Sequence, residues 1–265
     1  MSKCPNGKDE CDCTPDELRM AANRKPLKKE RPPPKVFKVK DPDPDEKFAD
    51  LHPHLPQPPA LLLIVGSVKQ GKSNLLVNLL CNPDMYKDKF DIVKIISNTL
   101  NADPKGKLLN KHFDCEDHYE DSMITDLIET QKKYEDFERP SVALFLDDIL
   151  TKDFKKNNAV SFLATRFRHY GIGLLGFTTQ SFRAVSGLIR NNATDVIIMK
   201  QQNQKELEKI NEEFGDMFPN IFMELYKKAI EDAPYSFLYM DLQTNPATAF
   251  IRFETKIGSG DKKLF

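Results

Sequence analysis

The segment that most constrains the fold of this chain is Ala60 to Leu80, ALLLIVGSVKQGKSNLLVNLL. An apolar run comes first, then a loop bounded by Gly66 and Gly71, and then a segment whose apolar residues recur at helical spacing. The loop has the spacing G-x-x-x-x-G-K-[ST], in which backbone N–H groups surround phosphates, a lysine reaches the β and γ oxygens and a hydroxyl holds Mg²⁺. The segment therefore predicts a strand, a phosphate-binding loop and a helix.

The residues expected to bind a nucleoside triphosphate are consecutive in the sequence. They are Gly66, Ser67, Val68, Lys69, Gln70, Gly71, Lys72, Ser73 and Asn74. The loop leads into a helix N-terminus, where the helix dipole and the unpaired N–H groups favour an anion. An ordinary turn is the alternative interpretation, and the apolar strand before the loop and the helix after it favour the nucleotide site.

Length and composition limit the class of protein. With 265 residues, 40% hydrophobic and 30% charged, we expect one domain of about 200 residues plus a tail. The net charge of −1 means that any contact with nucleic acid must come from a local patch. An odd cysteine count of five favours reduced thiols and an intracellular location. The sequence shows no apolar run long enough for a membrane span and no hydrophobic signal core, so we expect a soluble protein.

The N-terminal region differs in composition from the rest. Residues 1 to 59 hold 12 of the 18 prolines and have almost no periodic apolar pattern. We therefore expect a flexible, charged tail over residues 1–55, a P-loop domain over 56–256 and a second tail over 257–265. The basic stretch Arg24 to Lys40 fits either an arm for nucleic acid or a partner, or a solvated linker, and the residues do not decide between them.

The segments after the loop predict a parallel sheet. Asp91 to Ser97 and Ser141 to Ile149 are expected strands, and between them lie a polar stretch from Asn98 to Asp121 and a helix from Ser122 to Phe137. A strand, a crossover helix and a strand imply parallel pairing.

The second expected functional feature is the acid pair Asp147 and Asp148 at the end of SVALFLDDIL. In a P-loop NTPase the first acid supports Mg²⁺ on the side of Ser73, and the next acid can polarise the attacking water. The alternative interpretation is a turn that simply closes the strand.

The remaining elements complete an α/β fold. Asn157 to Tyr170 is an expected helix with Arg168 near its C-terminal end, where a cation also suits the helix dipole. The strand after it ends at Gln180, an amide that can sense a γ-phosphate or orient water. The later expected elements are a strand at Asp195 to Lys200, helices at Gln204 to Phe214 and Ile221 to Ile230, and an edge hairpin of Tyr235 to Leu242 with Ala249 to Phe253.

The order of these motifs resembles the FtsK–HerA superfamily of DNA-pumping ATPases. The sequence combines a P-loop, an apolar strand ending Asp-Asp, an Arg-His pair before an apolar strand ending in Gln, and Leu-Ile-Arg-Asn-Asn before another strand. Within the superfamily, the run RHYGIGLLGFTTQS, LIRNN and IIMK is most similar to the poxvirus-type genome-packaging ATPases of large DNA viruses and virophages. The resemblance covers roughly Leu61 to Phe253.

The resemblance implies a RecA/ASCE-like P-loop fold with a mostly parallel central sheet and helices on both faces. It also implies individual roles: Lys72 and Ser73 bind ATP and Mg²⁺, Asp147 supports the metal, Asp148 stands where many relatives carry a catalytic Glu, Gln180 is the polar sensor, and Arg168 acts on a neighbouring subunit's nucleotide. Asp148 is one methylene shorter than Glu, so the attacking water has to sit closer to it.

The expected partners also follow from the resemblance. The family moves double-stranded DNA through a homo-oligomeric ring, usually taken as a hexamer, with ATP bound between subunits. Capsid or portal-vertex proteins are further partners that it allows, and it places the protein in the viral factory of a host cell or in the virion.

Two other functional classes fit the residues less well. A GTPase would carry Asn-Lys-x-Asp, and the most similar string, Asn110 to Phe113, has Phe where the Asp belongs. A nucleotide-binding assembly or scaffold protein with weak or no turnover would keep Lys72 but lack a competent acid pair. Because the pair Asp147 and Asp148 is present, the sequence favours an ATPase.

Overall fold

The computed structural model describes residues 14, 46–100, 104–149, 158–260 and 262–264. The chain divides into two units, Met1–Asp43 and Pro44–Phe265, and the architecture below is that of the second. Apart from Thr14, the expected tail up to residue 45 lies outside the described residues, and so does its basic stretch.

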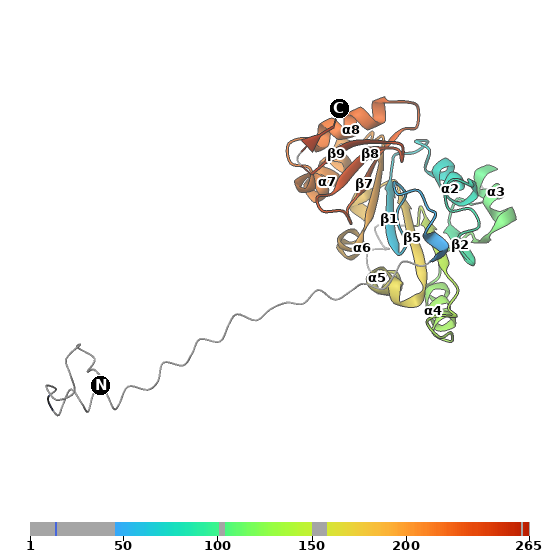
Figure 1. Ribbon diagram of the computed structural model, residues 1–265. Coiled ribbons are helices and arrows are strands. Elements are labelled where there is room, and N and C mark those ends of the chain that lie inside the picture. The colour runs from blue at the N-terminus through green and yellow to red at the C-terminus, as the bar shows by residue number, and fades with distance from the viewer. Residues whose placement is uncertain (1–13, 15–45, 101–103, 150–157, 261, 265) are drawn as a thin grey trace. The chain divides into compact units, whose positions relative to one another are not determined.

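The second unit is organised around one ten-stranded sheet with the order β10-β9-β8-β7-β6-β1-β5-β4-β2-β3 (Figure 1). Six strands are parallel: β1 (Ala60–Val65), β2 (Ile92–Ser97), β3 (Asp114–Glu116), β4 (Val142–Asp147), β5 (Ile172–Thr179) and β6 (Asp195–Met199). Four strands extend the sheet in antiparallel fashion: β7 (Phe237–Asp241), β8 (Thr248–Ile251), β9 (Thr255–Ser259) and β10 (Lys262–Lys263).

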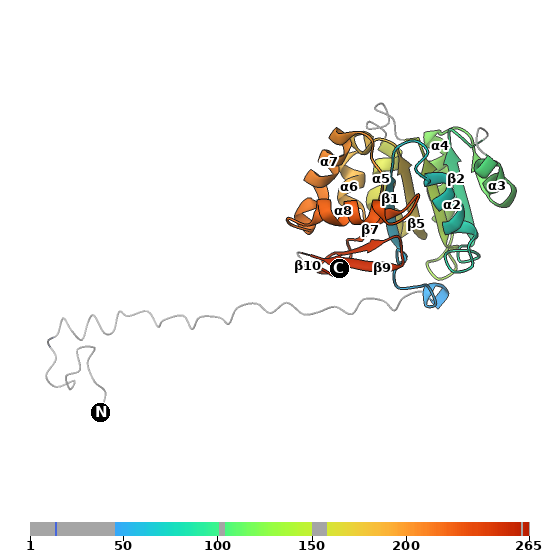
Figure 2. The ribbon, with the colours of Figure 1, turned by 90° about the horizontal axis from the view of Figure 1, so that it is seen from above.

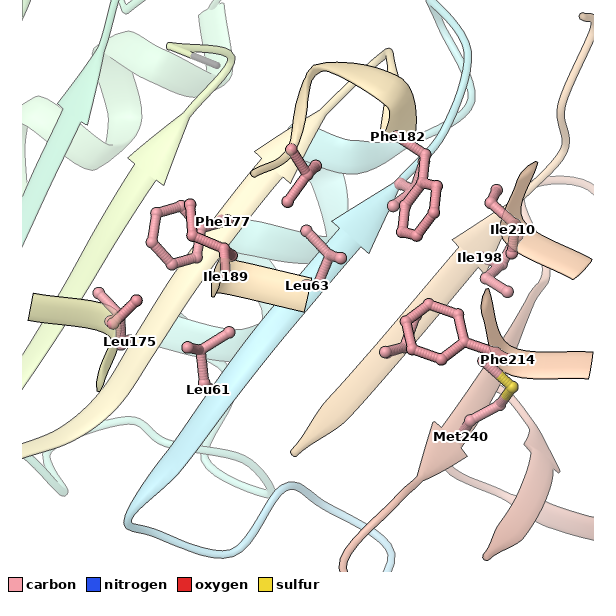
Figure 3. Packing of buried hydrophobic residues seen from close by; sticks show 14 of the residues in the cluster. Leu61, Leu63, Leu175, Phe177, Phe182, Ile189, Ile198, Ile210, Phe214 and Met240 are labelled. Carbon is pink, nitrogen blue, oxygen red and sulfur yellow. The ribbon is translucent and has the colours of Figure 1, made fainter. Parts of the chain in front are cut away.

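Both faces of the sheet are buried, which explains why the central strands are continuous apolar runs. Along β1, Leu61 and Leu63 enter one hydrophobic core, and Leu62 and Ile64 enter the other. Figure 3 shows the first core, in which Leu61 and Leu63 lie near apolar residues from β5, β6 and the helices above them.

Seven α-helices cover the two faces of the described sheet. The first core is formed with α4 (Asp121–Gln131), α5 (Asn158–Arg166), α6 (Gly187–Asn192), α7 (Gln204–Phe214) and α8 (Phe222–Glu231). The second is formed with α2 (Lys72–Cys81) and α3 (Pro104–His112). Figure 2 shows α6, α7 and α8 grouped together, away from α2 and α3. Short 3₁₀ helices complete the described elements: η2 (Glu46–Phe48), η4 (Phe167–Tyr170), η5 (Phe182–Ala184) and η6 (Gly215–Met217).

The fold class predicted from the sequence is confirmed, and several elements differ in detail. The polar stretch after β2 contains α3 and β3, which had not been expected. The helix expected to reach Phe137 ends at Gln131, and the helix expected to reach Tyr170 ends at Arg166, where η4 follows. Short helices and tight turns carry too few residues for a clear apolar period.

The domain also extends further at both ends than the boundaries expected from the sequence. Leu51 and Leu55 are buried in the second core, and the Tyr86 hydroxyl donates to the Pro56 carbonyl over 2.5 Å. At the other end, Ile257 of β9 is buried in the first core, and the next residue, Gly258, lies against Leu225 of α8. The hairpin of β7 and β8 is therefore not at the sheet edge, and part of the expected C-terminal tail is sheet.

None of the helices in the described ranges is long and apolar enough to cross a membrane.

Candidate active site

The loop between β1 and α2 is anchored at the carboxyl ends of the two strands that flank β1. The Gly66 N–H donates to the Thr179 carbonyl of β5 (3.1 Å), and the Ser67 N–H donates to the Lys200 carbonyl after β6 (3.3 Å). Lys69 and Gly71 have left-handed backbones, with φ of 61° and 103°. Such residues turn successive N–H groups toward one side, which makes a concave anion-binding surface.

The two glycines of the motif are required for different reasons. A Cβ on Gly66 would lie 2.8 Å from the Cβ of Met199 in β6, so Gly66 lets the loop pack against the neighbouring strand. Gly71 is required because its φ of 103° is strained for any residue with a Cβ. Packing against β6 therefore accounts for Gly66, and the left-handed backbone accounts for Gly71.

The Lys72 side chain is held in the loop by backbone carbonyls. Its ammonium donates to the Gly66 carbonyl (2.8 Å) and to the Ser67 carbonyl (3.4 Å), and only 8% of the residue is exposed. Burial lowers the pKa of Lys72, while the negative charges of Asp148 and Asp147 act to raise it. The cation therefore lies in an environment that disfavours its charge until anionic groups arrive.

Asp147 ends β4 between two strands that each supply a hydroxyl. Ser97 of β2 donates to its Oδ2 over 2.7 Å, and Thr178 of β5 donates to its Oδ1. Burial raises the pKa of the Asp147 carboxyl, and the two hydroxyl donors act to lower it. The carboxylate is thus oriented from both sides before any ligand binds.

Asp148 follows directly and points to a different partner. Its backbone is left-handed, with φ of 51°, and its N–H donates to the Thr178 carbonyl (3.2 Å) and hydroxyl (3.1 Å). The Gln180 amide at the end of β5 donates to its Oδ2 over 2.7 Å. The two carboxylates are therefore separated in environment, one buried and held by hydroxyls, the other half-buried and held by an exposed amide.

A cavity of about 590 Å³ lies at this edge of the sheet. Its walls include Val68, Lys69, Gly71, Lys72, Ser73, Asn74, Asp148 and Gln180, all of which the sequence had predicted. Gly66, Ser67 and Gln70 do not line this cavity, and their backbone N–H groups donate the hydrogen bonds that hold the loop in place. The sequence missed three further wall residues, namely Thr99, Lys105 and Tyr235.

Ser73 and Asp147 both line one small pocket, together with Ser97 and Thr99. A hydroxyl and a carboxylate are oxygen ligands of the kind that Mg²⁺ takes, and Mg²⁺ sites commonly use one or two carboxylates together with substrate phosphates. Asp147 retains acceptor capacity beyond its two hydrogen bonds. The residues therefore fit the magnesium site expected from the sequence. Within the described ranges, no group of three or more His, Cys, Asp or Glu residues is arranged to hold a metal ion. A magnesium ion at Ser73 and Asp147 would therefore need phosphate oxygens as further ligands.

Arg168 is not part of this cavity. It lies in η4, before the start of β5, whereas Gln180 follows the end of that strand. Eight strand residues at about 3.3 Å each separate the two ends by roughly 26 Å. The guanidinium is on an exposed residue and lies 5.4 Å from the centre of the Phe167 ring. An arginine so placed cannot reach the nucleotide site of its own chain.

No known protein-family model and no curated protein sequence matches this chain. Solved structures do match it. The DNA-packaging ATPase B204 from Sulfolobus turreted icosahedral virus aligns with a TM-score of 0.54 and 18% identity over 73% of this chain and 97% of that one. The genome packaging NTPase B204 from Sulfolobus turreted icosahedral virus 2, in complex with ATPγS, aligns with a TM-score of 0.51 and 18% identity over 72% and 95%. The same protein in complex with AMPPCP gives 0.51 and 19% over 72% and 96%. The chain has the fold of these P-loop ATPases.

Proposed function

We propose that this chain is an ATP-hydrolysing motor subunit that moves double-stranded DNA and packages a viral genome into a capsid. The observation that carries the proposal is the convergence of the phosphate loop, the Lys72 ammonium and the Asp148–Gln180 pair on one cavity. These are the groups that phosphoryl transfer to water requires, namely a phosphate cradle, a cation and a base.

The residues divide the chemistry among them. Lys72 places positive charge on the β and γ oxygens, where negative charge develops in the transition state. Asp148, oriented by Gln180, accepts a proton from the attacking water. Ser73 and Asp147 would hold Mg²⁺, which would neutralise phosphate charge. Burial raises the pKa of Asp147, and a cation beside it would favour the ionised form.

Support for the DNA part of the proposal is separate from support for hydrolysis. The B204 proteins are described as genome-packaging enzymes, and they share this fold over nearly their whole length. The motif order in the sequence favours the same class. We extend the proposal to a homo-oligomeric ring in which Arg168 meets a neighbouring chain's nucleotide, since Arg168 lies too far from the nucleotide site of its own chain to act there.

Removal of the Lys72 charge tests whether the cavity hydrolyses ATP. We expect Lys72→Ala to abolish phosphate release from ATP in the presence of Mg²⁺, because the transition state loses its buried cation. Lys209→Ala is the control, since Lys209 pairs with Glu212 on the exposed surface of α7. Near-normal hydrolysis by Lys72→Ala would contradict the proposal. A wild-type protein that binds ATP without turnover would instead identify a nucleotide-binding scaffold protein.

A further inference from the structure

A second cavity adjoins the phosphate cavity and is not used by the chemistry above. It measures about 300 Å³ and lies between α2 and the loops at the ends of β7 and β8. Gly71, Asn74 and Tyr235 line both cavities, so the two meet at the loop and the first turn of α2. The inference drawn from it rests on the proposed binding of a nucleoside triphosphate.

The position of the reacting groups fixes which end of the nucleotide faces the second cavity. Asp148 and Gln180 line the first cavity and not the second. The γ-phosphate has to lie beside these groups, because they act on the attacking water. The nucleoside therefore leaves the phosphate loop at the other end, past Gly71 and Asn74, where the second cavity opens.

The walls of the second cavity suit a flat heterocycle. Tyr235 and Phe253 supply aromatic rings, and Arg252 supplies a guanidinium. The Arg252 Nη2 forms ion pairs with Asp232 (3.2 Å) and Glu254 (2.9 Å), which restrain the guanidinium. Among the described residues, the buried Nε of Arg252 has no hydrogen-bond partner. Aromatic and guanidinium planes are the groups on which bases stack.

Among the residues of the cavity wall, Tyr235 combines an exposed side chain with an unusual backbone conformation. It is 66% exposed, although tyrosine is a large residue, and its backbone is left-handed with φ of 64°. Arg252, another residue of the cavity wall, also has a left-handed backbone, with φ of 53°. Non-glycine residues with a left-handed backbone are strained, and such residues gather at ligand clamps. The Tyr235 side chain also lies against Gly71, 3.3 Å from where a Cβ would stand.

We propose that the nucleoside half of the bound nucleotide occupies this second cavity, with its base stacked on the Tyr235 ring. The antiparallel extension of the sheet thus supplies the base site, and the parallel part supplies the phosphate site. Stacking accepts any purine face, so this contact provides affinity for the base without reading its hydrogen-bonding edge.

The test compares the binding of ATP, which carries a nucleoside, with that of inorganic tripolyphosphate, which does not. Each ligand is titrated into the full chain in the presence of Mg²⁺, and binding is measured by calorimetry. We expect Tyr235→Ala to weaken ATP binding roughly tenfold or more, the scale of a lost stacking contact, and to leave tripolyphosphate binding unchanged. Tyr235→Phe should restore ATP affinity, because the ring is kept. Tyr134→Ala is the matched control, since Tyr134 is also exposed and lies in the turn after α4.

Two outcomes would overturn the inference. Unchanged ATP affinity in Tyr235→Ala would show that the base does not stack there, and equal losses for ATP and tripolyphosphate would show that Tyr235 only shapes the phosphate loop. Failure of the wild-type chain to bind either ligand is a distinguishable result, because it would overturn the proposed function together with this inference.

Discussion

At the scale of single residues, the two adjacent acids are placed in different environments by the strands beside them. Asp147 lies in register with Ser97 of β2 and Thr178 of β5, and both hydroxyls hold its carboxylate. Asp148 turns out of the strand and meets Gln180. Separation of this kind lets one carboxylate support a metal while its neighbour accepts a proton.

This division predicts the behaviour of Asp148→Asn. An amide cannot take a proton from water, so we expect hydrolysis to slow about a hundredfold, while ATP binding stays close to that of the wild type. Single-turnover hydrolysis and equilibrium ATP titration measure the two effects separately. If ATP binding collapsed instead, Asp148 would be a metal ligand, and the roles of the two acids would have to be exchanged.

The residues of the loop motif and the polar residues at strand ends could be predicted from the sequence. The residues that hold these side chains in place could not. Lys72, Asp147, Asp148 and Gln180 follow from the loop motif and from polar groups at strand ends. Ser97 and Thr178 are ordinary hydroxyls in apolar strands, and nothing in their spacing marks them. They become significant only through the sheet register that places each beside Asp147.

At the scale of elements, the start of β6 carries a buried acid that makes stability depend on pH. The Asp195 carboxylate accepts hydrogen bonds from Tyr239 (2.7 Å) and Thr194 (2.7 Å), with Gln243 at 3.4 Å and Asp241 as the nearby like charge. Burial raises the pKa of Asp195 to about 6 from an ordinary 3.8, and the hydrogen bonds act to lower it. The folded chain therefore binds this proton more tightly than the unfolded chain does.

The sign of the effect follows from that difference in proton affinity. The stabilisation from protonated Asp195 is present at low pH, is lost as pH rises from about 4 to the folded pKa of about 6, and does not change further above it. Over that window the wild type should lose about 3 kcal/mol of unfolding free energy relative to Asp195→Asn. Urea denaturation of both proteins at several pH values measures this. A difference that stays constant between pH 4 and pH 7 would contradict the assignment.

The strength of the sequence pattern explains which elements could be predicted. The central strands β1, β4 and β5 are long apolar runs because both of their faces are buried, and α7 has a clear apolar period. The short, lysine-rich α3 and the half-exposed β9 have weak patterns. They owe their structure to partners distant in the sequence, as Gly258 of β9 does to Leu225 of α8, and such contacts are not visible in a local window.

At the scale of the whole molecule, the position of Arg168 separates a solitary ATPase from a ring. In an interface site, loss of Arg168 should lower turnover on the order of 10³-fold while ATP binding persists. We expect a mixture of Arg168→Ala and Lys72→Ala subunits, each inactive alone, to recover part of the activity, because some junctions pair an intact Lys72 with a neighbour's intact Arg168. If Arg168 only suited the dipole of its own helix, its loss would cost a few tenths to about 1 kcal/mol of stability and little turnover. A mixture without recovered activity would contradict the interface role.

The most direct test of the central claim is ATP hydrolysis by the full chain with and without double-stranded DNA. Because the net charge is −1, any contact with DNA has to come from a local basic patch, and heparin at matched charge is the control for non-specific binding of a polyanion to that patch. We expect phosphate release to rise several-fold with double-stranded DNA, not to rise with heparin, and to be lost in Lys72→Ala. Hydrolysis at the same rate in the presence and absence of double-stranded DNA would contradict the central claim.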